Sequence, residues 1–226
     1  MLIGILQTGQ APEDLAGPYG DYPDLFSDLL DGHGFDFKTW HVEAGEFPAD
    51  VTSADGWLIT GSRHGAYEAH AFIPRLEDFI RSAYQKKVPL VGVCFGHQII
   101  AQALGGKVEK FRGGWSVGAQ EYDFQGKPLR LNAWHQDQVV VKPDAAEVAA
   151  TSPFCENAAL VYGDRAFTVQ AHPEFGDDFI SGLIDTRGRG KVPDKLLDAA
   201  TAGLGAKLDN STIADKFAAF FKQPRG

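Results

Sequence analysis

An apolar stretch that ends in a cysteine between two glycines constrains the fold of this chain more than any other feature. Residues 88–93 form an apolar run of the kind found in strands buried on both faces of a parallel sheet. Cys94 follows, with Gly92 two residues before it and Gly96 two residues after it. Residues 97–104 then have a helical pattern, so the sequence predicts a strand, a tight turn at Cys94 and a helix.

The remaining pattern predicts an α/β fold. In the first half, strand-like residues 2–6, 35–41 and 56–60 alternate with helix-like residues 23–30 and 73–84. Strands separated by helices favour a largely parallel sheet. In the second half, short strand-like segments dominate and are expected to pair partly in antiparallel fashion. They are residues 108–111, 117–124, 129–133, 139–141 and 160–169, followed by helices at 177–185 and 213–221.

Length and charge bound the classes of function. A chain of 226 residues can bury one sizeable core, and residues 1–226 are expected to form a single domain. The formal net charge is −9. An acidic surface repels phosphate backbones and anionic lipids, so nucleic acid and membranes are not expected as partners.

Cysteine content and the N-terminal sequence favour a cytoplasmic location. The chain has two cysteines, Cys94 and Cys155, which are too few for the disulfide framework of a small secreted protein. The first residues lack the basic segment of a signal peptide. No apolar run approaches the roughly 20 residues that span a bilayer.

Cys94 is the candidate nucleophile. Glycines two residues before and two residues after a reactive side chain, at a turn from strand to helix, form the nucleophile-elbow pattern. The positive end of the following helix favours a thiolate. The same turn points the Phe95 backbone N–H toward the place where an oxyanion would form. Cys155 lacks this context and is expected to be structural.

His172 and Glu174 are the candidate base and its partner. A thiol nucleophile needs a base that holds its proton and later delivers it to the leaving amine. His172 follows a predicted strand, and Pro173 stiffens the turn after it. Glu174 is close enough in sequence to hold the imidazole in the correct tautomer, which is the third role in a catalytic triad.

The other histidines are weaker candidates for the base. His97 lies on the helix after Cys94, but its side chain leans toward the helix N-terminus and is expected to pack rather than react. His135 and Asp137 could supply a competing His–Asp pair. Four further histidines are expected on the surface or in loops, with His64 near the pocket: His33, His41, His64 and His70.

In these residues the chain resembles the class I glutamine amidotransferase family. The matching segments, in the family's order, are Thr-Gly-Ser at 60–62, Gly-Val-Cys-Phe-Gly-His-Gln at 92–98, His-Gln-Asp at 135–137 and His-Pro-Glu at 172–174. The resemblance extends from residue 1 to about residue 179. It is greatest to stand-alone members related to the glutaminase domain of GMP synthase, including plant γ-glutamyl peptidases.

The resemblance implies a three-layer α/β/α, flavodoxin-like fold that forms one catalytic domain with a Cys-His-Glu triad. It implies that the cysteine attacks the γ-carbonyl of glutamine or of a γ-glutamyl amide, that ammonia or an amine leaves, and that water hydrolyses the γ-glutamyl thioester to glutamate. The oxyanion hole would be the backbone N–H groups of Phe95 and of Ser62 or Gly61. The residues expected to bind substrate are Gln98, Trp115, Ser116 and His135.

Several functions remain open at this point. The resemblance to stand-alone members favours a self-sufficient γ-glutamyl hydrolase or peptidase. A glutaminase subunit that delivers ammonia to a separate synthetase would carry the same triad. A Cys-type α/β-hydrolase acting on esters or lactones would need an acid between nucleophile and histidine, a place that Asp137 or Asp164 could fill. A non-catalytic binding protein on the same scaffold is the fourth alternative, and the intact triad argues against it.

No cofactor or metal ion is expected. The chain has no Gly-rich phosphate loop of the Walker type and no clustered cysteine and histidine ligands. The expected partner is a small-molecule γ-glutamyl substrate, and association with a synthetase or with a second copy of the chain stays open.

Overall fold

A seven-stranded sheet forms the centre of the computed structural model, which describes residues 1–225. Its strands are β1 (Leu2–Gln7), β2 (Asp36–His41), β3 (Gly56–Ile59), β4 (Leu90–Val93), β9 (Glu147–Ala150), β10 (Ala159–Tyr162) and β11 (Ala166–Val169). Their order across the sheet is β2-β1-β3-β4-β11-β10-β9. Pairs from β2 to β11 are parallel, and β10 is antiparallel to both of its neighbours. The predicted α/β fold with a mostly parallel sheet is confirmed.

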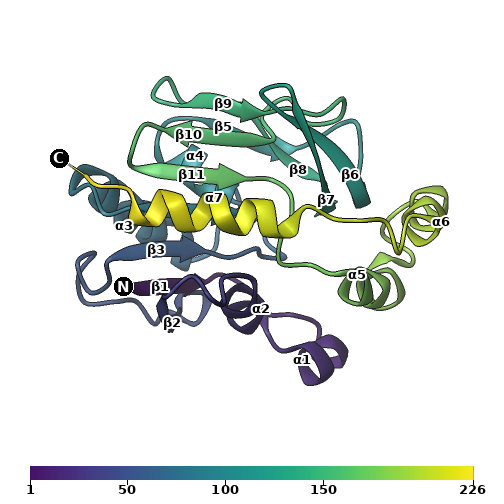
Figure 1. Cartoon of the computed structure of the whole chain (residues 1–226), viewed down its shortest axis with the longest axis horizontal. Helices are drawn as coiled ribbons and strands as arrows, with labels where there is room; N and C mark the ends of the chain where they lie inside the picture. The colour runs from purple at the N-terminus through teal and green to yellow at the C-terminus, as the bar shows by residue number, and fades with distance from the viewer. Residues whose placement is uncertain (226) are drawn as a thin grey trace.

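Helices cover both faces of this sheet (Figure 1). Helices α2 (Tyr22–Leu29) and α7 (Asn210–Lys222) lie on one face, and α3 (Phe72–Gln85) and α4 (Phe95–Ala103) lie on the other. Successive residues of a strand point to opposite faces, so Ile5 joins the core beneath α2 and α7 while Leu6 joins the core beneath α3 and α4. Within residues 1–225, no helix combines the length and apolar character that crossing a membrane requires.

The apolar run before Cys94 becomes β4, which lies between β3 and β11 in the middle of the sheet. All four of its residues are buried, because helices cover both of its faces. β11 is buried in the same way. In parallel neighbours the carboxyl ends of the strands meet at one edge of the sheet, so the segments that follow β3, β4 and β11 come together there.

Two small antiparallel sheets and several short helices complete the structure near that edge. The sheets pair β5 (Lys107–Lys110) with β8 (Asp137–Val141) and β6 (Ser116–Phe124) with β7 (Lys127–His135). The helical segments are α1 (Glu13–Tyr19), a 3-10 turn (Val42–Ala44), α5 (Asp177–Leu183), a π-helical turn (Ile184–Gly188) and α6 (Asp194–Ala202). A separate apolar cluster joins α1, α5 and α6 to β6.

The structure differs from the sequence prediction in several segments, among them the edge strand β9, which was not predicted. Residues 160–169, expected as one strand, form the hairpin of β10 and β11, with a left-handed Gly163 (φ 58°) in the turn. The helix expected at 177–185 ends as an α-helix at Leu183 and continues as the π-helical turn. α1 and α6 were not predicted. Gly17 and Pro18 weaken the helical pattern of α1, and α6 presents only a short apolar face.

Candidate active site

Cys94 occupies the turn between β4 and α4, as predicted. Its backbone has φ 53° and ψ −103°, which is uncommon for a residue other than glycine. A Cβ on Gly96 would lie 2.2 Å from the Ile59 carbonyl oxygen, and a Cβ on Gly92 would lie 2.5 Å from the Gly96 carbonyl oxygen. Only glycine fits at either position, so the two glycines permit the tight, strained turn that presents the thiol at the sheet edge.

The N-terminus of α4 lies beside the thiol. Phe95 is the first residue of this helix, where a backbone N–H has no acceptor within the helix. The next N–H, that of Gly96, donates to the Thr60 carbonyl oxygen at 3.1 Å. The positive end of the helix therefore favours negative charge at Cys94, and the Phe95 N–H is placed to donate to a ligand oxygen.

The structure brings His172 and Glu174 next to Cys94. His172 Nδ1 lies 2.7 Å from Glu174 Oε1, and both side chains are buried. A carboxylate can only accept a hydrogen bond, so His172 Nδ1 carries a proton and donates a hydrogen bond to Glu174. His172 Nε2 is then the nitrogen that can exchange a proton with a substrate. A Cβ added to Gly61 would lie 3.2 Å from His172 Cε1 and 3.9 Å from Cys94 Cβ. The side chains of His172 and Cys94 therefore both lie next to Gly61.

The surroundings of His172 favour its charged form. Burial by itself lowers the pKa of His172, but the negative charges of Glu174 and of the Cys94 thiolate, with hydrogen bonds to both residues, raise that pKa well above its ordinary value. An imidazolium beside a thiolate is the state in which a cysteine is nucleophilic and a proton is ready for the leaving group.

Packing fixes the plane of the imidazole. The His172 ring stacks on Phe175 with centroids 4.1 Å apart and an angle of 4° between the rings. The His172 backbone N–H donates to the Asn132 carbonyl oxygen at 2.8 Å, and Asn132 Nδ2 donates to the Phe175 carbonyl oxygen at 3.0 Å. β7, which carries Asn132, thus clamps the turn from His172 to Phe175. Sequence reasoning missed this clamp because its two parts are far apart along the chain.

Replacing Glu174 with glutamine is expected to lower kcat/KM by about 10²-fold. It is also expected to lower, by about one unit, the pH above which kcat/KM falls. The raised pKa of His172 keeps the imidazolium charged into the alkaline range, so we expect activity to be lost as the pH rises through that pKa. Glu174→Gln removes a charge that raises the pKa, so deprotonation comes at lower pH. A pH profile of kcat/KM tests this, with the exposed Glu13→Gln as control. An unshifted limb in Glu174→Gln would contradict the assigned role.

The loop after β3 lies beside Cys94 and His172. The Gly61 carbonyl oxygen lies 3.0 Å from Thr8 Oγ1 and 3.0 Å from Thr60 Oγ1. In a trans peptide the N–H points opposite to the C=O, and residues 1–225 contain no cis peptide bond. The Ser62 N–H therefore points away from the two threonine hydroxyls, toward the pocket that Ser62 lines. Of the two expected residues, Ser62 is therefore the better candidate for an N–H that faces a ligand.

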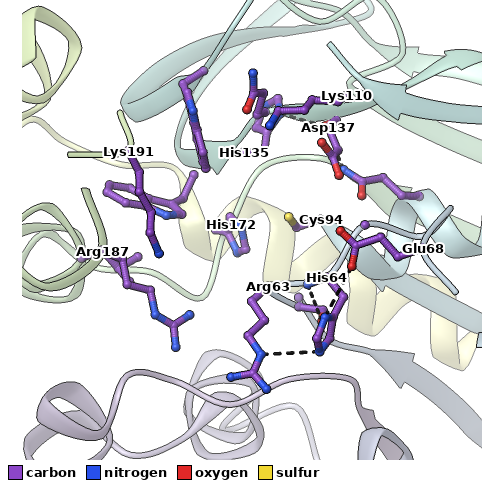
Figure 2. Close-up of a pocket in the computed structure, with 18 of the residues that line it drawn as sticks. Arg63, His64, Glu68, Cys94, Lys110, His135, Asp137, His172, Arg187 and Lys191 are labelled. Atoms are coloured by element: carbon purple, nitrogen blue, oxygen red, sulfur yellow. Dashed lines mark hydrogen bonds and ion pairs between the residues drawn. The ribbon is translucent and has the colours of Figure 1, made fainter. Parts of the chain in front are cut away.

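A pocket of about 320 Å³ opens over Cys94 and His172 (Figure 2). Three of the four residues expected to bind substrate line it: Gln98, Trp115 and His135. Ser116 is the exception. It is buried and absent from the lining, because neighbouring residues at the start of a strand point in opposite directions and Trp115 takes the pocket side.

Gln98 and His135 each keep one acceptor atom without a hydrogen-bond partner among residues 1–225. Gln98 Nε2 donates to the Asp137 carbonyl oxygen at 2.9 Å and to Gln170 Oε1 at 3.0 Å, which uses both amide hydrogens. Only its carbonyl oxygen is then left for a ligand. His135 Nδ1 lies 3.2 Å from the Asp137 carbonyl oxygen, and its Nε2 has no partner among the described residues. Burial, and then the charge of His172, lower the pKa of His135 to about 3, so this ring stays neutral.

The competing acids do not form a second triad. His135 contacts the backbone of Asp137 and not its carboxylate, which instead interacts with Tyr67. Asp164 lies in the turn before β11, at the end of that strand opposite His172. Neither aspartate is therefore placed as the acid that a Cys-type α/β-hydrolase needs.

Charged side chains line both sides of the pocket. Figure 2 shows Arg187 and Lys191 on the side of His172, and Glu68, Asp137 and Lys110 on the opposite side of Cys94. Sequence reasoning missed Arg187 and Lys191, because the segment around the π-helical turn has no recognisable motif. Only its packing through the apolar cluster of α1, α5 and α6 brings it to the pocket.

The two residues expected to be inert are both buried. Cys155 is 1% exposed, and burial raises the pKa of its thiol to about 12. His97 is fully buried and its Nδ1 lies 2.8 Å from Thr168 Oγ1, so it packs beneath the site as expected. Neither residue lines the pocket.

Known proteins share much of this sequence. The family model for glutamine amidotransferase class-I matches residues 34–178. A relative from Arabidopsis thaliana, named gamma-glutamyl peptidase 4, is 33% identical over 183 residues, covering 74% of this chain and 73% of that protein. A relative from Methanopyrus kandleri, named as one subunit of a glutamine-hydrolysing GMP synthase, is 34% identical over 159 residues, covering 60% of this chain and 78% of that one.

Solved structures support the fold. The crystal structure of a glutamine amidotransferase from Methylobacillus flagellatus superposes with a TM-score of 0.78 at 21% identity, covering 99% of this chain and 96% of that one. At this identity the likeness concerns the fold alone, and it agrees with the three layers described above.

Proposed function

The chain belongs to the class I glutamine amidotransferase family, and from this premise we propose that it hydrolyses γ-glutamyl amide bonds through a thioester on Cys94. The observation that carries the proposal is the convergence of a cysteine at a helix N-terminus, a buried His–Glu pair and a backbone N–H at one point of one pocket. These are the groups that amide cleavage by a cysteine requires.

The proposed reaction has two halves. The Cys94 thiolate attacks the γ-carbonyl carbon, forming a C–S bond, and the Phe95 and Ser62 N–H groups donate to the oxygen that becomes negative. His172 gives its proton to the leaving nitrogen as the C–N bond breaks. Water then attacks the thioester while His172 takes a proton from it, and the C–S bond breaks to release glutamate and restore the thiolate. Glu174 holds the imidazole in place through both halves.

The orientation of the loop after β3 supports a hydrolase that acts without a partner. Hydrogen bonds to Thr8 and Thr60 hold the Gly61 carbonyl oxygen away from the pocket in the isolated chain. This orientation supports a second oxyanion donor, the Ser62 N–H, that is in position before any other protein binds. An enzyme whose donors are pre-positioned does not need a partner to reorient them during the reaction.

Thr8→Val is expected to lower kcat by about 10-fold with little change in KM, since it removes one of two hydroxyls that hold Gly61 and thereby misdirects a donor used in the transition state. Steady-state kinetics on a γ-glutamyl amide provide the measurement. Thr52→Val, in an exposed loop, is the matched control. A Thr8→Val enzyme with unchanged kcat would show that the loop does not depend on this hydroxyl.

The charges in the pocket support a leaving amine that carries a carboxylate. The leaving nitrogen must lie beside His172, the proposed acid, and Arg187 and Lys191 lie on that side (Figure 2). An amino acid or peptide attached through its amino group presents a carboxylate there, whereas the ammonia released from glutamine presents none. On the other side, the free carbonyl oxygen of Gln98 can accept from the α-ammonium group of the glutamyl part.

Glutamate release by the purified protein tests the proposal. The substrates are glutamine, γ-glutamyl dipeptides and the same dipeptides with an amidated C-terminus, with Cys94→Ala as control. We expect the free acids to exceed the amidated forms in kcat/KM by about 10-fold, the effect of one favourable charged contact. Equal rates for the two forms would remove the carboxylate from the proposal. No Cys94-dependent release from any substrate would contradict an independent hydrolase.

The alternative function is a glutaminase subunit that delivers ammonia to a synthetase. Its support is the similarity to a protein named as a GMP synthase subunit. The triad would be the same, so glutamine turnover that is low alone and rises on adding a synthetase would favour this alternative.

A further inference from the structure

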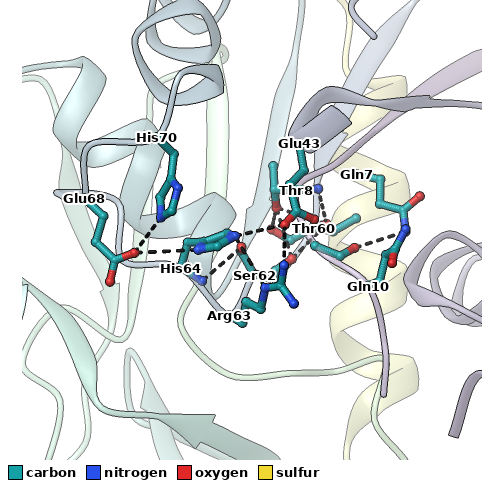
Figure 3. Close-up of polar contacts among 12 residues, drawn as sticks. Gln7, Thr8, Gln10, Glu43, Thr60, Ser62, Arg63, His64, Glu68 and His70 are labelled. Atoms are coloured by element: carbon teal, nitrogen blue, oxygen red, sulfur yellow. Dashed lines mark hydrogen bonds and ion pairs between the residues drawn. The ribbon is translucent and has the colours of Figure 1, made fainter. Parts of the chain in front are cut away.

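Two histidines and a glutamate meet at the rim of the pocket, outside the triad. This rim cluster consists of His64, Glu68 and His70, in the segment between β3 and α3 (Figure 3). Glu68 Oε2 lies 2.8 Å from His70 Nε2 and 3.6 Å from His64 Nδ1. One ligand atom from each residue lies within 4.8 Å of the other two. His64 and Glu68 also line the pocket, so the cluster borders the active site.

A fourth residue fixes the tautomer of His64. Glu43 Oε1 lies 2.9 Å from His64 Nε2, and because a carboxylate only accepts, the proton lies on Nε2. Arg63 Nε lies 3.5 Å from the same nitrogen, which is too long to compete, and Arg63 Nη2 donates to Glu43 at 3.2 Å. In this tautomer the lone pair of His64 Nδ1 turns toward Glu68 Oε2, so two acceptor atoms face each other and can hold a cation between them.

A divalent cation can occupy the place between these acceptor atoms. The His64 and His70 rings are in contact, with centroids 3.9 Å apart, so one ion can reach a nitrogen of each ring. A carboxylate that accepts from the far nitrogen of a histidine is also the usual outer partner of a metal-binding histidine. Glu43 occupies that place for His64.

The distances suit a small divalent ion. Ligand atoms about 2.0–2.1 Å from a tetrahedral Zn²⁺ lie about 3.3 Å from one another. The two separations from Glu68 Oε2, 2.8 Å and 3.6 Å, lie on either side of that value. Two imidazole nitrogens and one carboxylate oxygen are a ligand set that zinc accepts, with water in the fourth position. The partial exposure of Glu68 and His70 gives the ion a path from solvent.

We propose that the rim cluster is a binding site for Zn²⁺ or a similar divalent transition-metal ion, with His64 Nδ1, Glu68 Oε2 and His70 Nε2 as ligands and Glu43 as the outer partner. The ion cross-links three residues of the segment that follows Gly61 and Ser62. This cross-link stabilises the loop beside Cys94. The expectation of no metal, based on the lack of a cysteine and histidine motif, did not consider ligands spaced His-x3-Glu-x-His.

Metal binding is measured on the full chain in a Cys94→Ser background, because the Cys94 and His172 pair could itself bind Zn²⁺. Protein stripped with a chelator is titrated with Zn²⁺ alone, and Co²⁺ reports the ligands through its visible absorption. We expect one ion per chain, at least about 10-fold weaker affinity in His70→Gln and in His64→Gln, and a loss of about 10- to 100-fold in Glu43→Gln. His33→Gln is the control, since His33 also lies near a carboxylate, 3.6 Å from Asp215, but belongs to no cluster.

Thermal unfolding gives a second readout. Zn²⁺ is expected to raise the Tm of Cys94→Ser, and His70→Gln is expected to lose that rise while keeping its Tm without metal. An unchanged Zn²⁺ affinity in a His64→Gln, His70→Gln double variant would overturn the proposal. So would binding that disappears with Cys94→Ser, because the ion would then lie at the thiol.

Discussion

Replacing Cys94 with alanine is expected to lower kcat for γ-glutamyl amide hydrolysis by about 10⁶-fold, to the level left by the remaining groups of the site. The thiol forms the bond to the substrate, and no other group in the pocket can take its place. The other cysteine is fully buried and its thiol pKa is raised to about 12, so it holds no thiolate at neutral pH.

The matched control is Cys155→Ser. It is expected to leave kcat/KM within about 2-fold of the original value for the folded protein, because the residue lies outside the pocket lining. Both variants are assayed for glutamate release after thermal unfolding has shown that they are folded. An inactive Cys155→Ser beside an active Cys94→Ala would reverse the assignment of the nucleophile.

Replacing His172 with alanine is expected to lower kcat by about 10⁴- to 10⁶-fold. The substitution removes the group that protonates the leaving amine and later activates water. It also removes the charge that stabilises the thiolate of Cys94, so both halves of the reaction slow down. The loss should exceed that of Glu174→Gln, because Glu174 orients the imidazole and transfers no proton itself.

The measurement is glutamate release under single turnover, with His41→Gln as the control. His41 is an exposed histidine at the end of β2, away from the triad. The His172→Ala enzyme should form the thioester slowly as well as hydrolyse it slowly. A His172→Ala enzyme that releases amine at the normal rate would show that another group acts as the acid.

The centre of the fold follows from local patterns in the sequence. The apolar run before Cys94 and the two glycines around it specify β4 and the elbow, because burial on both faces and a turn without room for a Cβ each allow few residue types. The central sheet is parallel where strands and helices alternate in the sequence. The hairpin of β10 and β11 was missed because both strands are apolar and only Gly163 marks the turn.

The environment of the site depends on contacts between distant segments. The Cys, His and Glu residues were proposed from their spacing. The contacts of Thr8, Asn132 and Phe175 around them form only when β1, β7 and the turn after β11 meet at one edge of the sheet. Ser116 lies outside the pocket lining because neighbouring residues of a strand point to opposite faces.

The most direct test of the account is to identify the covalent intermediate. The protein is mixed with a γ-glutamyl dipeptide, quenched in acid during turnover, digested and analysed by mass spectrometry. The account predicts one added glutamyl group on the peptide that contains Cys94, and its absence in Cys94→Ala. Turnover without any adduct on Cys94, or with the glutamyl group on a different residue, would contradict it.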